Sequence, residues 1–355
     1  MGPGTSGPAV PAYPPGQSGQ DSFSLTILTA SVMLGVEADY ETVLALSTNG
    51  FAPDVRPDEE CRADWMTRGR GQCLDVVAAR LGIRVRWVGA WAPRKYGVQA
   101  DPAAGRKAAF EIRHAFKRSE VVITDSGWTE SFALWGIVTA ATEDGRISGA
   151  NPASRENALD HVCSLWGLSR AEWTMTAAEA DRIMFGRAAG RIRGDREPFL
   201  PGSLACSLPA VGSPAVPGAV VWGLRAMDAW IAQMGEPAFQ EDDPGSSAGN
   251  AKACALGFAD GAAVTASYLR RRLPSYPAAA HPMVASLAAR YERIAALLAP
   301  FAAGDEGGGY RAIMGDPAKQ RDHIEVVLRP IRAELAAAAD EADAWGARAM
   351  QPEPA

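Results

Sequence analysis

The spacing of hydrophobic residues changes along the chain, and this change limits the possible folds more than any other feature. Residues 83–88 alternate apolar and polar side chains, which is typical of a half-buried strand. Residues 121–124 and 134–139 are apolar runs typical of strands that are buried on both faces. From Val284 onward, apolar residues recur at intervals of three and four, the period of a helix. The sequence therefore predicts a sheet in the first part and helices in the last.

Helices are predicted before the sheet. Asp21 and Ser22 can cap the first, an apolar run over residues 23–34 that stops at Gly35, and we expect it to be a buried central helix. Residues 39–46 and 72–81 form two further helices. The sequence thus indicates helices first and strands afterwards.

Turn residues complete the predicted sheet. A helix over residues 108–117 lies between the strands, and the turn at residues 143–146 leads into a return strand that starts at Ile147 and ends at Asn151. We expect a small antiparallel sheet in an α+β domain over residues 21–193.

Other segments flank this domain. Residues 1–20 hold ten Gly or Pro and no charge, so we expect a flexible leader without the features of a signal peptide. The Pro-rich residues 194–218 form a connector, and residues 219–349 form a helical extension. Its second apolar stripe begins at Ile324 and contains Pro330, where we expect a kink or a helix boundary.

Composition excludes several classes of protein. The net charge of −6 does not provide the basic face that nucleic-acid binding needs, so no nucleic-acid partner is expected. No uninterrupted apolar run of about eighteen residues occurs, which argues against a membrane span. The 5 cysteines form no CxxC pair, and their odd number favours reduced thiols and a cytoplasmic location.

The order of these elements resembles a known family. The segment over residues 21–51 resembles the opening of bacterial papain-like proteins, which are related to bacteriocin-processing cysteine peptidases and to the N-terminal domain of the butirosin-biosynthesis acyltransferase. The similarity covers most of residues 21–345 and implies a papain-like domain followed by a helical extension. It rests on Leu34-Gly35, Asp39-Tyr40-Glu41, Leu46-Ser47, Gly50-Phe51, Val121 to Thr124, Trp135 to Thr139, Glu143-Asp144-Gly145 and Trp222 to Trp230.

The resemblance also implies that the catalytic pair is lost. The family's chemistry needs a thiolate at a helix amino end and an imidazole on the facing strand. Here Ser22 takes the place of the cysteine, and residues 130–139, which should carry the histidine, contain none. Asn151 stands where the third, orienting residue belongs, but an orienting residue acts only on a base.

Cys73 is the other candidate nucleophile. Gly71-Gln72-Cys73 opens a predicted helix and resembles the Gln-Cys of papain-like enzymes, although cysteine is also a common small core residue. His161 and Cys163 fall two residues apart in a predicted helix and would face different ways, so no metal site is predicted.

The remaining candidates for ligand binding lie around the predicted site. Asp125 and Glu130 flank Gly127-Trp128 in a loop, where they form either a pocket rim or a pair of solvated acids. Trp128 and Trp135 line a cleft or fill the core. Asp21, next to Ser22, completes this set of candidate ligand-binding residues.

Our favoured hypothesis is a catalytically degenerate papain-like protein that binds a small molecule or peptide in the former active-site cleft. The alternative is an acyltransferase or amide-bond hydrolase of natural-product metabolism that uses Ser22 or Cys73. A third interpretation is a helical scaffold with an apolar patch on the extension, through which homo-oligomers form. No cofactor and no membrane partner are expected.

Overall fold

The computed structural model describes residues 5–6, 9–13, 21–56, 62–63, 74–91, 94–95, 98–99, 102–125, 127–129, 134–159, 163–194, 221–235, 244–303 and 308–349. The chain forms two compact units. The first comprises Met1–Val43 and Met66–Ala177, and the second comprises Leu44–Trp65 and Ala178–Ala355.

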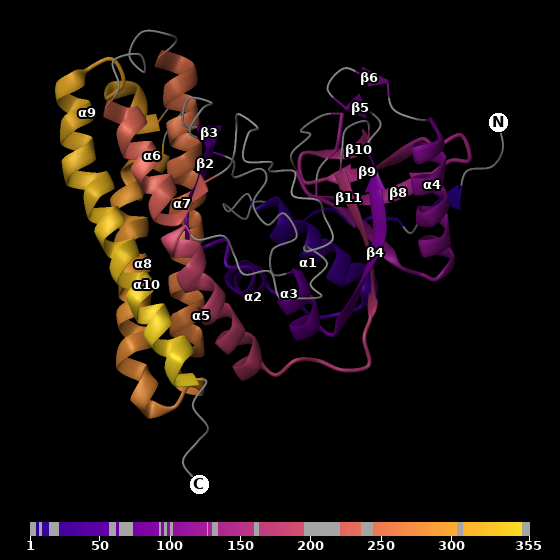
Figure 1. Ribbon diagram of the computed structural model, residues 1–355, viewed down its shortest axis with the longest axis horizontal. Coiled ribbons are helices and arrows are strands. Elements are labelled where there is room, and N and C mark those ends of the chain that lie inside the picture. The colour runs from indigo at the N-terminus through magenta and orange to yellow at the C-terminus, as the bar shows by residue number, and fades with distance from the viewer. Residues whose placement is uncertain are drawn as a thin grey trace. The chain divides into compact units, whose positions relative to one another are not determined.

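An antiparallel sheet is the centre of the first unit (Figure 1). The order along the sheet is β10-β9-β8-β7-β11-β4, and β1 pairs with β8. The strands are β1 (Thr5–Ser6), β4 (Ile83–Trp91), β7 (Val121–Thr124), β8 (Gly136–Ala141), β9 (Ile147–Asn151), β10 (Ser154–Ala158) and β11 (Cys163–Arg170), with the separate hairpin β5 (Arg94–Lys95) and β6 (Val98–Gln99). The helices are α1 (Ser22–Leu34), α2 (Tyr40–Leu46), α3 (Leu74–Leu81) and α4 (Pro102–Lys117).

The predicted boundaries of α1 are confirmed, and each has a physical cause. The side chain of Asp21 accepts a hydrogen bond from the backbone N–H of Ser24 at 2.9 Å and so satisfies a free donor of the first turn. Gly35 ends the helix with a φ of 63°, in the left-handed region that glycine adopts without strain. Residues from Ser22 to Ser31 are buried, as expected of a central helix.

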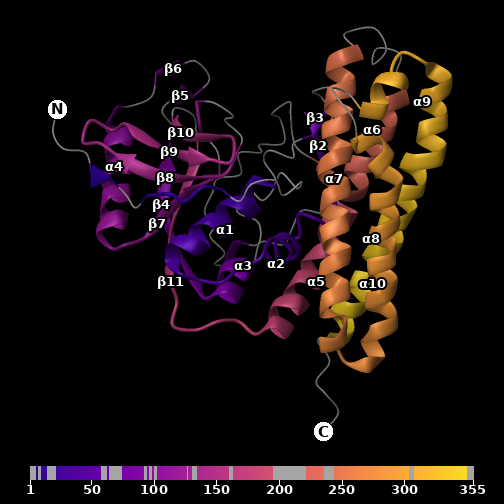
Figure 2. The ribbon, with the colours of Figure 1, turned by 180° about the vertical axis from the view of Figure 1, so that it is seen from behind.

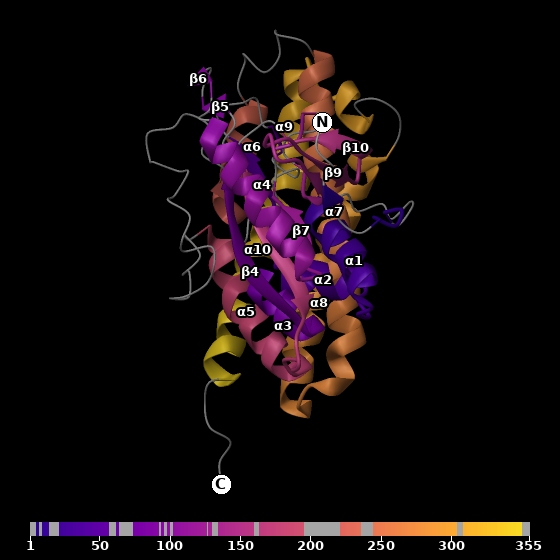
Figure 3. The same ribbon diagram turned by 90° about the vertical axis from the view of Figure 1, so that its right-hand side faces the viewer.

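The sheet separates α1 from α4, as Figures 1 and 2 both show. Alternate residues of the strands face opposite ways, so Val122 and Val138 pack with Ile112 of α4 on one face. Figure 3 views this layer with α4 in front of the strands. The expected α+β architecture is therefore confirmed for this unit.

One central strand contradicts the sequence interpretation. Cys163, which we expected in a helix, begins β11, and this strand pairs with both β4 and β7. Because β11 lies between two partners, its pairing comes from strands far away in sequence, and its own Ser and Gly residues give a weak local signal. His161 lies outside the described residues.

Helices make up most of the second unit. They are α5 (Ala177–Arg193), α6 (Gly223–Gly235), α7 (Pro244–Arg272), α8 (His281–Ala302), α9 (Pro317–His323) and α10 (Arg329–Ala349), beside a small sheet in the order β12-β2-β3, formed by β12 (Val221–Trp222), β2 (Asp54–Arg56) and β3 (Arg62–Ala63). In Figure 1 the helices from α6 to α10 run side by side. The helical C-terminal part is thus confirmed, and its α8 stripe is fully buried, with 0% exposure at Val284, Leu287, Tyr291, Ile294 and Leu298.

The division between the units differs from the expected boundary at residue 193. The second unit includes α5 and the early segment Leu44–Trp65. Two contacts explain why this segment belongs there: the Tyr291 hydroxyl donates to the Phe51 carbonyl at 2.8 Å, and the Arg191 guanidinium pairs with the buried Asp54 carboxylate at 3.0 Å. The expected connector is described only at Gly194; its other residues lie outside the described part.

A π-helical turn at Ile324–Leu328 precedes α10, so the boundary expected near Pro330 is present. Pro330 has no backbone N–H and its ring crowds the preceding turn, which accounts for a wider turn at this point. His323 ends α9 and is 3% exposed. Its ring packs edge-on against Phe301 and Tyr310.

Candidate functional site

The amino end of α1 is the start of the predicted site. Ser22 is the first residue of the helix and is 1% exposed. Asp21, a predicted ligand-binding residue, is 5% exposed, and its carboxylate is bonded to the N–H and the hydroxyl of Ser24. Asp21 therefore acts as the helix cap here.

Strand β8 begins directly opposite Ser22. The backbone N–H of Trp135 donates a hydrogen bond to the Ser22 Oγ at 3.2 Å. Within the described residues of the first unit no imidazole bonds to Ser22, and the one described histidine there, His114, packs on Phe110 of α4. The Ser22 hydroxyl thus accepts a main-chain hydrogen bond, and no described histidine lies beside it to act as a general base.

Aromatic rings fill the space behind this contact. Trp135 packs edge-on against Phe23 of α1 with centroids 4.9 Å apart and stacks on Trp166 of β11 at 5.2 Å. Trp166 meets Trp87 of β4 at 5.7 Å. We call these four side chains the aromatic row. Since Phe23, Trp135 and Trp166 are at most 1% exposed, the row is a packed layer along the α1 face of the sheet.

Asn151 ends β9 and follows Ala150, which is in register with Ile137 of β8. Its Oδ1 accepts hydrogen bonds from the backbone N–H groups of Ala153 and Ser154 at 2.9 and 2.8 Å, which fixes the orientation of the amide. Its Nδ2 is buried and has no acceptor in the described part of the chain. The contact between Ser22 and Trp135 thus lies where β8 begins, and Asn151 lies where the neighbouring strand β9 ends.

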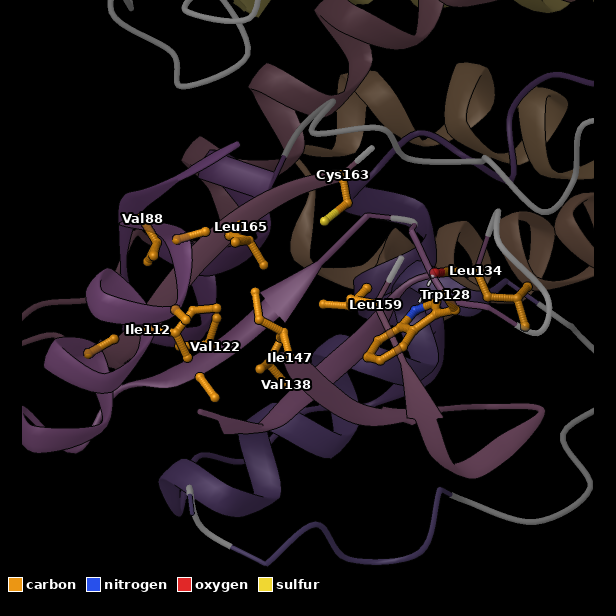
Figure 4. Packing of buried hydrophobic residues seen from close by; sticks show 14 residues of the cluster. Val88, Ile112, Val122, Trp128, Leu134, Val138, Ile147, Leu159, Cys163 and Leu165 are labelled. Carbon is orange, nitrogen blue, oxygen red and sulfur yellow. Dashed lines mark hydrogen bonds between the residues drawn. The ribbon is translucent and has the colours of Figure 1, made fainter. Parts of the chain in front are cut away.

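Trp128 belongs to the core of the opposite face, as Figure 4 shows. Its indole is 0% exposed and lies over Gly136 and Gly149, while its Nε1 donates to the Leu134 carbonyl at 2.9 Å. Of the two roles left open for Trp128, core packing is the one that matches this burial.

Asp125 is also buried, at 6% exposure. Its Oδ1 accepts from the backbone N–H of Ser164 at 2.8 Å and so ties the end of β7 to β11. A solvated loop acid, one of our two interpretations, is therefore wrong for Asp125. The remaining predicted residues, Cys73 and Glu130, lie outside the described residues.

Tyr13 is a site residue that the sequence analysis missed. Its hydroxyl donates to the Ala150 carbonyl of β9 at 3.1 Å, and burial raises the pKa of its phenol. The available signal was its position as the one aromatic residue among the first twenty. Contrary to the expectation of a flexible leader, part of this segment is bound to the first unit.

Buried charges elsewhere in the described structure are paired within the fold. Burial acts to raise the pKa of Glu120, but hydrogen bonds and charge from Arg86 and Arg118 outweigh it and hold that pKa below its usual value. In the second unit Asp181 pairs with Arg272 at 2.8 Å and accepts from the Tyr268 hydroxyl. These carboxylates have structural partners and provide no general base.

Two absences among the described residues bear on other functions. No group of three or more His, Cys, Asp or Glu side chains among them could hold a metal ion. No helix in the same residues is both long and apolar enough to cross a bilayer.

The chain was also compared with known proteins. No protein-family model and no curated protein matches it.

Proposed function

We propose that the protein is a catalytically silent papain-like protein that binds a small molecule or peptide beside the amino end of α1. The observation that carries this proposal is the hydrogen bond from the Trp135 N–H to the buried Ser22 hydroxyl. A serine becomes a nucleophile when a base removes its proton, and among the described residues the Ser22 hydroxyl accepts from a main-chain N–H and has no basic side chain as a partner.

The free donor of Asn151 supports a binding role. An unpaired N–H in a buried position costs about 1–3 kcal/mol, and a ligand that supplies an acceptor recovers that energy. The amide cannot rotate to find another partner, because Oδ1 is held by two backbone donors. A carbonyl oxygen is the simplest acceptor for this position, which favours an amide or a peptide as ligand.

Reactivity distinguishes this proposal from the acyltransferase alternative. The full chain is treated with a serine-reactive phosphonate and, separately, with a thiol alkylator, and modified residues are identified by mass spectrometry. We expect no phosphonate on Ser22 in the folded chain. Selective modification of Ser22 or Cys73 that disappears after unfolding would favour the enzyme and overturn the proposal.

Binding is tested with uncharged N-acetyl dipeptide amides as probes, using ligand-observed NMR. Asn151→Asp keeps an oxygen for the backbone donors of Ala153 and Ser154 and replaces the N–H donor with a carboxylate oxygen, which repels an acceptor on the ligand. We expect this variant to bind the probes about tenfold more weakly, which corresponds to one lost hydrogen bond. Equal affinity of the two proteins would contradict a role for Asn151.

A further inference from the structure

The N-terminal segment pairs with an edge of β8. Thr5 and Ser6 lie opposite Ala141 and Ala140 in an antiparallel arrangement. On its other edge β8 pairs with β9, whereas β7 pairs with β8 only as far as Val138. β1 therefore occupies the part of the β8 edge that β7 leaves open, where main-chain groups would otherwise lack partners.

Further along the segment, Tyr13 lies between α1 and the strands. Its hydroxyl is bonded to the Ala150 carbonyl and lies beside Thr26 and Ile137. Thr26 is one helical turn after Ser22 on the same face of α1, and Ile137 is two residues after Trp135 on the same face of β8. Tyr13 thus lies between α1 and β8, one helical turn along α1 from the contact between Ser22 and Trp135.

The chemistry of these contacts is typical of peptide recognition by strand addition. β1 is recognised through its main chain, which any extended peptide can supply, and Tyr13 provides a side-chain contact that gives selectivity. Residues 1–20 contain no charged side chain, so the segment that docks here is uncharged along its side chains. The occupant that fits is an extended, uncharged peptide with a tyrosine several residues after the paired strand.

We infer that this surface, formed by the β8 edge at Ala140 and Ala141 and by the Tyr13 position between Thr26 and Ala150, is a peptide-binding groove. Thr5, Ser6 and Tyr13 occupy it within the same chain, and a separate peptide of the same chemistry replaces them. The inference rests on the proposed function and specifies its ligand as a peptide. Because a tethered segment competes at an effective concentration of the order of millimolar, the free peptide binds weakly to the intact chain.

The test uses the full-length protein and a fluorescein-labelled peptide with the sequence of residues 1–16. In the chain, Tyr13→Ala weakens the internal occupant, so the labelled peptide should bind this variant at least about tenfold more tightly than the wild type. Fluorescence anisotropy measures both affinities. Thermal unfolding of both proteins verifies that the variant is folded.

Two altered peptides identify the contacts. A peptide with alanine in place of its tyrosine loses the phenol contact, and a peptide N-methylated at Thr5 and Ser6 cannot donate main-chain hydrogen bonds from these residues. Both should bind the Tyr13→Ala chain at least about tenfold more weakly than the unaltered peptide. The inference would be overturned if the three peptides bound with equal affinity. It would also be overturned if the Tyr13→Ala chain bound the labelled peptide no more tightly than the wild type.

The outcomes also separate this inference from the function on which it rests. If dipeptide amides bind in a manner that depends on Asn151 while the labelled peptide does not bind, only the groove is wrong. If Ser22 or Cys73 reacts selectively with the activity probes, the proposed function itself is wrong, whatever the peptide does.

Discussion

Trp128 can lie flat on the sheet because two of the residues beneath it have no side chain. A Cβ atom at Gly136 would lie 2.4 Å from the indole ring, and one at Gly149 would lie 2.1 Å from the Ile137 carbonyl oxygen. Neither distance is tolerable without movement of the backbone or of a fully buried ring. The two glycines are therefore part of the core of the first unit.

Gly149→Ala should accordingly lower the free energy of unfolding by about 2–4 kcal/mol, because the new methyl group overlaps a backbone oxygen. The measurement is urea unfolding followed by tryptophan fluorescence. The matched control is Gly186→Ala in α5, where a Cβ meets nothing within 4 Å. The free energy of unfolding of this variant should rise by about 0.5–1 kcal/mol, because alanine has a higher helix propensity than glycine. Similar effects of the two substitutions would refute the overlap.

His323 makes stability depend on pH. Burial lowers the pKa of its imidazole to about 4, from 6.5 in the unfolded chain. Between these values the unfolded chain binds a proton that the folded chain does not, so the folded state loses up to about 3 kcal/mol as pH falls from 6.5 to 4.

The measurement compares the pH profiles of wild-type and His323→Phe protein by denaturant unfolding. We expect the variant to lose less stability across this window than the wild type. Leu298→Ala, a cavity variant in the same unit, serves as control and should lower stability by about 2–5 kcal/mol at every pH. Parallel profiles for wild type and His323→Phe would exclude His323 as the cause.

At the scale of secondary structure, local signals were sufficient where an element has its own cap or stop. The side chain of Asp21 and the left-handed backbone of Gly35 are encoded within α1 itself, so its limits were predictable. The strand β11 was not predictable, because its place between β4 and β7 depends on distant pairing. For the same reason the docking of Tyr13 on β9 and the burial of Asp125 against Ser164 left no local pattern.

The cap of α1 gives an element-scale prediction. Asp21→Ala removes the acceptor for the Ser24 N–H and should lower the free energy of unfolding by about 1 kcal/mol. Asp21→Asn retains an acceptor oxygen, so its free energy of unfolding should fall much less. Thermal or urea unfolding measures the difference, and an equal loss in both variants would indicate that the carboxylate charge matters more than the cap.

At the scale of the whole molecule, the helical unit bears on the scaffold interpretation, which stays a prediction. That interpretation expected a large apolar patch on the extension. Among the described residues of α6 to α10 and the turns between them, the one exposed large hydrophobic side chain is Val326, at 57%. The apolar stripes of these helices are used within the unit itself.

The ion pair between Asp54 and Arg191 holds the early segment Leu44–Trp65 in the second unit, with 5% and 2% side-chain exposure. Arg191→Met should lower the free energy of unfolding by about 3–5 kcal/mol, because it leaves a buried carboxylate without its cation. Adding Asp54→Leu should restore much of the loss, since the pair is then replaced by apolar side chains. A double variant less stable than Arg191→Met alone would contradict this account; calorimetry provides the comparison.

The polypeptide changes from one unit to the other three times, after Val43, after Trp65 and after Ala177. No single cleavage can therefore release either unit as an intact piece, and no single splice point would allow one to be inherited or grafted without the other. A fragment that keeps one unit whole therefore has to be assembled from two separate pieces of the chain.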